Sequence, residues 1–422
     1  MKFIWLSISI IAMQGIQSIN FLHNYFLKKV YNSSLNSYYY LLSYTKIDLE
    51  YILKTTTRLA LNCVPDTLKS LPIFLVVDDT LQEKFGVHFE CRNKLFDHAK
   101  HNGSNYLNGH CFVGLILKIP VWIRESDICY LSISLGYRLK KDNPKKSKLQ
   151  IASEMINCAM EVLKKYQTVI LLCDSWYPKG KVIETVESHN NLELIANVRV
   201  DTVIYDLPPE PTGKRGRPRI KGDRLDIHDQ QEFSFTKVNE YFTATRKVIS
   251  NLFKKVVYAT VTTPNLDNEK SYRLFISTIM PEQLEKMLPV VEDEYLNDVP
   301  EDLKVSLLPY IMYRFRWSIE VVFYEQKKFW SFGDYMLRSA IGVENYVNII
   351  NICYSCVTLL PWWNKKFADL KGKSPQHVKC VLSQKINREI FFASFVLDPE
   401  SAKKRINIMK AVISRVLMKK RL

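Results

Sequence analysis

Four polar side chains between residues 313 and 327 have a spacing that would place them on one face of an α-helix. We call them the signature stripe: Tyr313, Arg316, Glu320 and Lys327. At about 100° per residue, all four project within an arc of roughly 60°. Glu320 could hold a metal ion while Arg316 and Lys327 bind the phosphates of a phosphodiester. The alternative is a solvated face with an i,i+4 ion pair between Arg316 and Glu320, and the helix by itself does not decide between the two.

Two aspartates directly follow apolar segments that are typical of buried strands. Asp78 follows the segment 71–77 (LPIFLVV), and Asp174 follows the segment 168–173. A charge is costly to bury without a partner, so these positions suggest a chemical role. A turn residue or a helix cap is the ordinary alternative. Carboxylates at the ends of neighbouring strands could converge with Glu320, and three such oxygen ligands with open positions describe a site for two Mg²⁺ ions in phosphoryl transfer.

The segments that must position these residues predict a mixed α/β fold. Apolar runs or alternating patterns predict strands at 71–77, 111–123, 128–137, 168–173 and 192–200, and helical periodicity predicts a helix at 149–166. Between 201 and 297 the sequence predicts a β-rich insertion, with short strands at 232–243, 255–263 and 272–279. Helix returns at Pro300 and extends, as one helix or an interrupted one, to about Trp330.

Composition favours a polyanionic partner. Lys and Arg number 59 against 43 Asp and Glu, a net charge of +16. Nucleic acid is the commonest polyanion, and an anionic membrane surface is the rival. Nine scattered cysteines predict reduced thiols of a cytosolic protein. The apolar run Phe3–Met13 is similar to a signal-peptide core, but it is too short to span a bilayer and no convincing cleavage site follows, so we expect a buried helix and no membrane association.

A basic segment lies inside the predicted insertion. Residues 214–221 read KRGRPRIK, and Lys214, Arg215 and Arg217 are its candidate DNA-binding residues. The segment resembles an AT-hook, whose Arg-Gly-Arg lies in a narrow A·T minor groove. A flexible, solvated loop tip is the alternative, and in both cases the charges could contact a DNA backbone.

The whole pattern resembles the DDE transposases of bacterial insertion sequences. Asp78, Asp79 and Thr80 match the D-x-T that carries the first catalytic aspartate, and Asp174 in LLCDSWY is similar to the second-strand aspartate. The signature stripe matches Y-x2-R-x3-E-x6-K of the cut-and-paste branch at every fixed position. Asp79 could serve instead of Asp78, but neighbouring strand residues point to opposite faces, so only one should bind metal. The resemblance covers residues of about 70 to 350.

The resemblance implies a chemistry and a set of partners. It implies that Asp78, Asp174 and Glu320 are catalytic and bind two Mg²⁺ ions, for which Mn²⁺ would substitute, and that Tyr313, Arg316 and Lys327 hold DNA. The expected function is a transposase that cleaves and joins double-stranded DNA at element ends, acting as a homodimer in the bacterial cytoplasm at the nucleoid. The alternatives are a transposase-derived protein that binds DNA without cleaving it, and a nuclease of the same fold that does not join strands.

The same resemblance implies a ribonuclease H-like fold, a mixed sheet flanked by helices, with helical regions at both ends. The expected organisation has five parts. They are a helical N-terminal region that could be a DNA-binding remnant (1–70), the first part of the catalytic core (71–200), the β-rich insertion between the second and third carboxylates (201–297), the second part of the core with the signature helix (298–350), and a helical C-terminal region (351–422).

Overall fold

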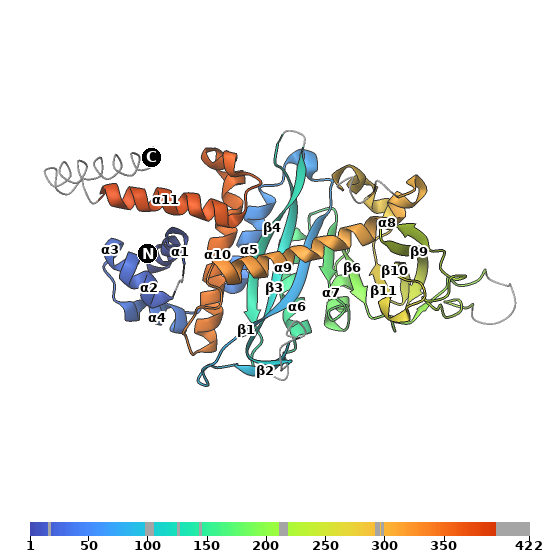
Figure 1. Cartoon of the computed structure of the whole chain (residues 1–422), viewed down its shortest axis with the longest axis horizontal. Coiled ribbons are helices and arrows are strands. Elements are labelled where there is room, and N and C mark those ends of the chain that lie inside the picture. Colours follow the sequence, from blue (N-terminus) through green and yellow to red (C-terminus); the bar gives the residue numbers. More distant parts are fainter. Residues whose placement is uncertain are drawn as a thin grey trace, which may run out of the picture.

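The computed structural model describes residues 1–15, 18–97, 105–124, 127–142, 146–210, 218–291, 296 and 299–393, with the side chains of 391–393 left aside. These residues form a mixed α/β structure with one large mixed sheet. In Figure 1 the N-terminal helices gather with α10 and α11 at one end of the sheet, and strands β9, β10 and β11 lie at the other. The predicted α/β class is therefore confirmed.

The described strands are hydrogen-bonded in the order β2-β3-β1-β5-β6-β11-β10-β9-β7, with β4 on β3 and β8 on β9. Only the pairs β1–β5 and β5–β6 are parallel among the described strands. The bounds are β1 (Ile73–Glu83), β2 (Asn93–Phe96), β3 (Tyr106–Trp122), β4 (Ile128–Leu139), β5 (Val169–Cys173), β6 (Leu192–Val198), β7 (Ile204–Tyr205), β8 (Thr236–Val238), β9 (Tyr241–Ser250), β10 (Lys255–Thr263) and β11 (Arg273–Ser277).

The helices are concentrated before, within and after the first half of the sheet. The N-terminal ones are α1 (Lys2–Ala12), α2 (Ile19–Leu22), the π-helix η1 (His23–Leu27), α3 (Lys28–Val30), α4 (Leu35–Tyr44), α5 (Leu49–Leu61) and η2 (Asp66–Leu68). Those inside the sheet region are α6 (Lys148–Leu163), α7 (Lys181–Glu187), η3 (Glu269–Ser271) and η4 (Pro281–Val290). The later ones are α8 (Glu301–Tyr313), η6 (Arg314–Trp317), α9 (Ser318–Phe329), α10 (Ala340–Trp363), η7 (Lys365–Leu370) and α11 (Pro375–Ala393).

The centre of the sheet is the apolar part that the sequence predicts. Every residue of β5 is buried, and so is β1 from Ile73 to Asp78, as expected of strands covered on both faces. The predicted end of the first strand is wrong, however. β1 continues to Glu83, because its polar second half pairs with the long strand β3 as far as the Glu83–Gly109 pair. Asp78 therefore lies inside a strand rather than at its end.

The strands of 201–297 continue the same sheet. β11 pairs with β6, with Leu274 opposite Val198, so the described antiparallel strands from β7 to β11 extend the parallel centre sideways. The predicted strand 232–243 is wrong in its bounds. A turn at Asn239, whose φ is 54°, divides it between β8 and β9. The predicted strands 255–263 and 272–279 correspond to β10 and β11.

The chain segment that carries the signature stripe crosses the sheet (Figure 1). It is not one regular α-helix, because the 3-10 helix η6 separates α8 from α9. α9 packs on β1, β3 and β4. Gly114 of β3, which pairs with Asp78, permits this approach: a Cβ there would lie 2.8 Å from the ring of Phe323. The missing side chain therefore lets α9 lie close beside Asp78.

Helix α10 covers the free edge of β4. Asn348 accepts a hydrogen bond from the Tyr137 N–H at 3.0 Å and donates one to its carbonyl at 3.0 Å. Glu344 accepts from the Leu139 N–H at 3.0 Å. At the β-bulge beside them, Gly136 has φ 149°, and a Cβ would lie 3.1 Å from the Asn348 oxygen. The polar side chains of α10 thus satisfy an edge that would otherwise be open to another strand.

The first helix is part of the packed structure. Leu6 and Ile10 of α1 are buried, and Asn387 of α11 donates to the Ala12 carbonyl at 2.8 Å. The predicted buried helix at the N-terminus is confirmed. Among the described residues, no helix has the length and apolar character that crossing a bilayer requires.

Candidate active site

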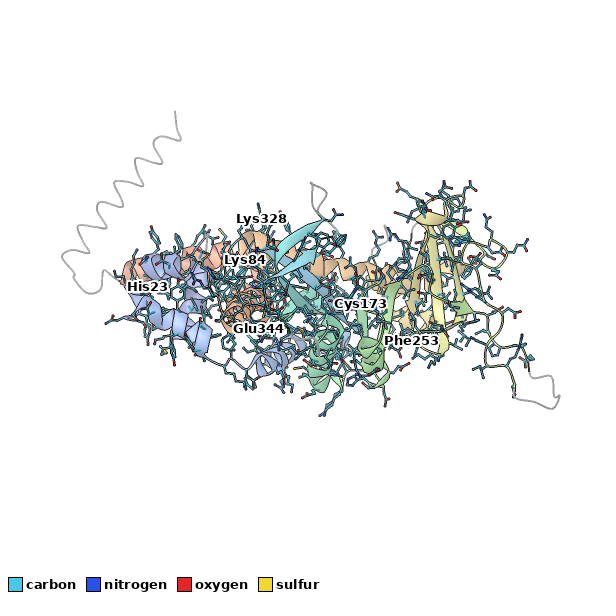
Figure 2. All side chains as sticks on the ribbon, turned by 90° about the horizontal axis from the view of Figure 1, so that it is seen from below. His23, Lys84, Cys173, Phe253, Lys328 and Glu344 are labelled. Atoms are coloured by element: carbon cyan, nitrogen blue, oxygen red, sulfur yellow. The ribbon has the colours of Figure 1, made fainter. Side chains whose placement is uncertain are left out.

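The first two candidate carboxylates lie on neighbouring parallel strands. Val76 of β1 pairs with Leu172 of β5, and Asp78 and Asp174 each follow two residues later. Parallel neighbours lie about 4.8 Å apart and direct paired side chains to the same face. In Figure 2, Cys173, the residue before Asp174, lies near the middle of the molecule, between His23 of the N-terminal helices and Phe253 beside β9. The two aspartates therefore meet at the centre of the sheet.

Arg316 joins Asp78 to the third candidate carboxylate. Its Nη1 lies 2.8 Å from Asp78 Oδ2 and 3.4 Å from Glu320 Oε1. The short η6 turn places Arg316 over β1, and Glu320 follows in the first turn of α9. The i,i+4 ion pair expected of a solvated face is thus present, but the guanidinium is largely buried and its shorter contact is with the sheet. The helix face is part of an interior cluster of charges.

Burial and mutual repulsion make Asp78 an unusual carboxyl group. Burial, together with the charge of Asp174, raises its pKa to about 8, against the opposing effects of Arg316 and of a 2.8 Å hydrogen bond from the Asp79 N–H. Burial also raises the pKa of Asp174, although the Trp176 N–H donates to it at 3.0 Å. Two carboxyl groups that disfavour joint ionisation form a place where a bound cation is stabilising.

Asp79 has a different set of partners. Lys148, the first residue of α6, donates to both of its oxygens at 2.9 and 3.1 Å. The Tyr177 hydroxyl donates to it at 3.0 Å, and the Cys111 thiol at 3.4 Å. Asp78 contacts the α9 side instead, as the alternation along a strand requires. Asp79 is thus paired with a lysine on the α6 side, whereas Asp78 shares the guanidinium of Arg316 with Glu320, so Asp78 rather than Asp79 lies with the third candidate carboxylate.

The outer members of the signature stripe contact other strands. Tyr313, the last residue of α8, packs its ring 5.0 Å from that of Phe275 on β11, and burial raises its pKa further above the ordinary value. Lys327 is exposed on α9 and donates to the Leu81 carbonyl of β1 at 2.7 Å. The structure thus brings Arg316 and Glu320 together with Asp78, and leaves Tyr313 and Lys327 at either end of the cluster. Lys214, Arg215 and Arg217 lie outside the described residues.

The donor set suits a divalent metal ion, but the described side chains are not arranged around one. No group of three or more His, Cys, Asp or Glu among the described residues is placed to hold a metal. The guanidinium of Arg316 lies where Asp78 and Glu320 would need to meet. Carboxylate oxygens are the ligands that Mg²⁺ prefers. The position already stabilises one cation, so the donor chemistry fits a metal ion although Arg316 occupies the place between the carboxylates.

Three contacts to the aspartates of this site were not predicted from the sequence. They are made by Lys148, Trp176 and Tyr177. The two aromatic residues come two and three positions after Asp174, so their closeness to it could have been anticipated. Lys148 gave no signal, because only the packing of α6 against β3 brings it to Asp79.

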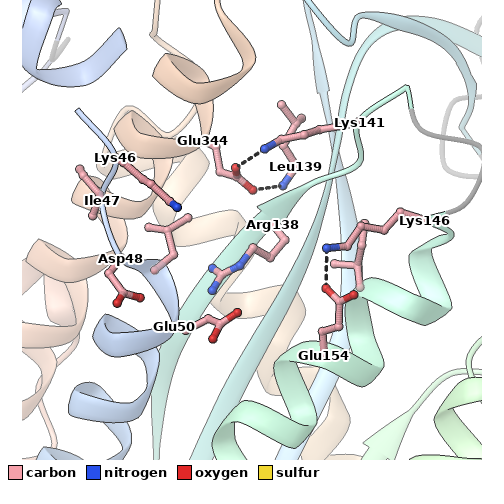
Figure 3. A pocket seen from close by; sticks show the side chains of 12 residues that line it. Lys46, Ile47, Asp48, Glu50, Arg138, Leu139, Lys141, Lys146, Glu154 and Glu344 are labelled. Carbon is pink, nitrogen blue, oxygen red and sulfur yellow. Dashed lines mark hydrogen bonds and ion pairs between the residues drawn. The ribbon is translucent and has the colours of Figure 1, made fainter. Parts of the chain in front are cut away.

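A separate cavity of about 720 Å³ lies between the α4–α5 connection, β4, α6 and α10 (Figure 3). Its wall carries basic and acidic side chains in balance. Lys141 pairs with Glu344 at 2.8 Å and Lys146 with Glu154 at 2.6 Å. None of the predicted site residues lines it, so it is not part of the candidate active site.

Comparison with known proteins gives one family. The family of DDE superfamily endonucleases matches residues 26–250, just over half of the chain, a stretch that includes Asp78 and Asp174. No curated protein sequence matches.

Two solved structures are similar at low levels. A piggyBac transposase in a synaptic complex with hairpin DNA is 11% identical, covers 93% of this chain and 71% of its own, and has a TM-score of 0.43. The NurA nuclease from Sulfolobus solfataricus is 12% identical, covers 67% of this chain and 95% of its own, and has a TM-score of 0.24. At these scores neither likeness carries an argument about fold or function.

Proposed function

The chain belongs to the DDE superfamily endonucleases, and from this premise we propose that it is a transposase with a ribonuclease H-like core. It would cleave double-stranded DNA at the ends of an insertion sequence of the cut-and-paste branch and join those ends to a target. One observation carries the proposal: Arg316 contacts both Asp78 and Glu320, while burial and the nearby charge of Asp174 raise the pKa of Asp78 to about 8. Carboxylates that are far apart in sequence thus converge on one cationic group.

In this proposal Asp78, Asp174 and Glu320 hold two Mg²⁺ ions, for which Mn²⁺ would substitute. Such ions, when bound, supply activation of the attacking hydroxyl and stabilisation of the leaving oxygen in an in-line displacement. The sheet contributes rigidity, because Asp78 pairs with Gly114 of β3 and lies two residues beyond the pairing of β1 with β5. Asp174 is held by the N–H of Trp176. Two of the three carboxylates are therefore oriented before substrate binds.

The signature stripe would hold the DNA. A backbone phosphate offers Arg316 a bidentate partner in place of its single contacts with Asp78 and Glu320. Movement of the guanidinium to the phosphate would release both carboxylates. Lys327 would add an electrostatic contact on the far side of Glu320, and Tyr313 a hydroxyl on the near side. A homodimer on DNA in the bacterial cytoplasm belongs to the same proposal, as do Lys214, Arg215 and Arg217 as further DNA contacts.

The test is strand cleavage and joining with Mg²⁺ on duplexes that carry the genomic sequences flanking the gene. We expect Asp78→Asn, Asp174→Asn and Glu320→Gln each to abolish cleavage and joining while DNA binding persists. The matched control is Glu184→Gln, an exposed carboxylate at 2.6 Å from Lys181 on α7, which should cleave like wild type.

Each other outcome identifies an alternative. Full cleavage by one of the three site variants would remove that residue from the site. DNA binding without cleavage by the wild type, under conditions in which Mg²⁺ or Mn²⁺ is saturating, would indicate a protein that only binds DNA. Cleavage without joining would indicate a nuclease, since carboxylates fix the phosphoryl chemistry but not the acceptor.

A further inference from the structure

Two lysines meet one exposed tryptophan beside Asp174. We call Lys148, Trp176 and Lys179 the lysine–tryptophan cluster. The ammonium of Lys148 lies 4.2 Å from the centre of the indole ring, and that of Lys179 lies 4.6 Å from it. The Trp176 N–H donates to Asp174 at 3.0 Å, so the backbone that carries the ring is fixed to a candidate catalytic carboxylate.

Packing alone does not account for this ring. Trp176 is 36% exposed, although the neighbouring Tyr177, whose ring centre is 5.2 Å away, is fully buried. Its indole N–H has no hydrogen-bond acceptor among the described residues. A large aromatic side chain at the surface with a free donor is typical of a binding surface rather than of a core.

Only one of the two lysines in the cluster is paired with a carboxylate. Lys148 is held by both oxygens of Asp79. Lys179 is exposed and forms no ion pair with any described residue. Its ammonium is nevertheless located, because the indole ring attracts it. An uncompensated cation is thus held over the ring of Trp176, whose backbone N–H is bound to Asp174.

We propose that the lysine–tryptophan cluster binds a backbone phosphate of the DNA strand that lies on the β5 side of the active site. Lys179 supplies the ionic contact, the indole N–H of Trp176 is a second donor, and Lys148 positions the ring. With Arg316 and Lys327 on the α9 side, the carboxylates would then lie between two sets of phosphate contacts. The inference rests on the proposed function, since DNA is its ligand.

Salt dependence separates a phosphate contact from a general loss of charge. Each neutralised phosphate adds about 0.9 to the slope of log K against log salt on duplex DNA. We expect Lys179→Ala to reduce that slope by about one contact and to weaken binding several-fold at low salt. Trp176→Ala should have a similar effect, whereas Trp176→Phe, which keeps the aromatic face, should retain most of the slope.

The chain offers a matched control two residues away. Lys181 is exposed at the start of α7, and its ammonium is paired with Glu184 at 2.6 Å. Lys181→Ala removes the same charge from the same surface, and we expect it to leave the slope at the wild-type value. The measurement is fluorescence anisotropy of the full chain on a duplex, titrated with salt from about 50 to 200 mM, and thermal unfolding checks that each variant is folded.

The outcomes are distinguishable. Equal slopes for Lys179→Ala and Lys181→Ala, in a protein that binds and cleaves DNA, would overturn this inference and leave the proposed function intact. If Trp176→Ala does not fold, the comparison of the two lysine variants still decides. If the wild type neither binds nor cleaves DNA, the proposed function fails, and the inference fails with it.

Discussion

At the residue scale, Arg316 has two possible kinds of partner, the carboxylates of the site and a DNA phosphate, and it cannot bind both at once. Its guanidinium contacts Asp78 at 2.8 Å and Glu320 at 3.4 Å, and both are proposed metal ligands. The same guanidinium is proposed to bind a DNA phosphate. If both hold, DNA and metal must strengthen each other's binding, because the phosphate removes the competitor of the metal. Arg316 would then keep the site closed to metal ions until DNA arrives.

We therefore expect Arg316→Gln to raise the affinity of the DNA-free protein for Mn²⁺ roughly tenfold. A hydrogen bond to a charged group contributes about 1.5–3 kcal/mol, and about 1.4 kcal/mol corresponds to a factor of ten. Arg316 lowers the pKa of Asp78, so its removal lets that carboxyl hold a proton at higher pH, and titration calorimetry should compare the two proteins at several pH values. Lys328→Gln, an exposed residue of the same helix, is the control. Unchanged Mn²⁺ affinity in Arg316→Gln would show that the guanidinium does not compete.

At the element scale, the end of α9 is held by a buried lysine. Lys379 of α11 is 1% exposed, donates to the Phe329 carbonyl at 3.4 Å and lies 4.5 Å from the centre of the Trp330 ring. Cations are favourable at a helix C-terminus, where carbonyl groups lack partners. Burial nevertheless dominates and lowers the pKa of Lys379 to about 8. The helix that carries Glu320 thus depends on a charge that the fold only partly compensates.

This arrangement predicts a pH dependence. The pKa of Lys379 is lower in the folded chain than the ordinary lysine value, so between about 8 and 10.5 the unfolded chain binds more protons and the free energy of unfolding rises with pH. We expect Lys379 to contribute roughly 3 kcal/mol to that rise. Burial lowers the pKa of Lys84 and of Lys118 to about 8 as well, so the contribution of Lys379 is measured as the part of the rise that Lys379→Met loses relative to wild type. Denaturant unfolding at several pH values measures it. Lys385→Met, an exposed position on α11, should behave like wild type, and a parallel loss in both variants would refute the assignment.

At the scale of the whole molecule, the two ends of the described chain pack together. Ser383 and Asn387 of α11 both donate to the Ala12 carbonyl of α1, at 2.5 and 2.8 Å. α1 also contacts α10, which covers the β4 edge of the sheet. The packing of α1 is thereby connected, through α10, to strand β4 of the sheet on which α9 packs.

Loss of a buried side chain in α1 should therefore destabilise the whole chain. Leu6 is 1% exposed, and Leu6→Ala should lower the free energy of unfolding by about 2–5 kcal/mol. Ile4, at 52% exposed on the same helix, provides the control, and Ile4→Ala should stay within about 0.5 kcal/mol of wild type. Denaturant unfolding of the full chain measures both. A leader that is removed from the mature protein would instead make the two variants equal.

Much of the core was determined by local sequence alone. The buried strands β1 and β5, the helix α6 and the positions of Asp78 and Asp174 after apolar segments all follow from short patterns. Such patterns suffice because burial and backbone periodicity within one element depend on neighbouring residues. The spacing of the signature stripe likewise predicted that Arg316 and Glu320 would be neighbours, which their 3.4 Å contact confirms.

Only the tertiary structure decided what those residues contact. The Arg316–Asp78 ion pair joins residues 238 positions apart, and nothing in either segment specifies it. The continuation of β1 to Glu83 also depends on tertiary structure, because the polar second half of β1 pairs with the long strand β3. Local patterns fix which face of an element is buried, but the partner of that face depends on the topology of the whole sheet.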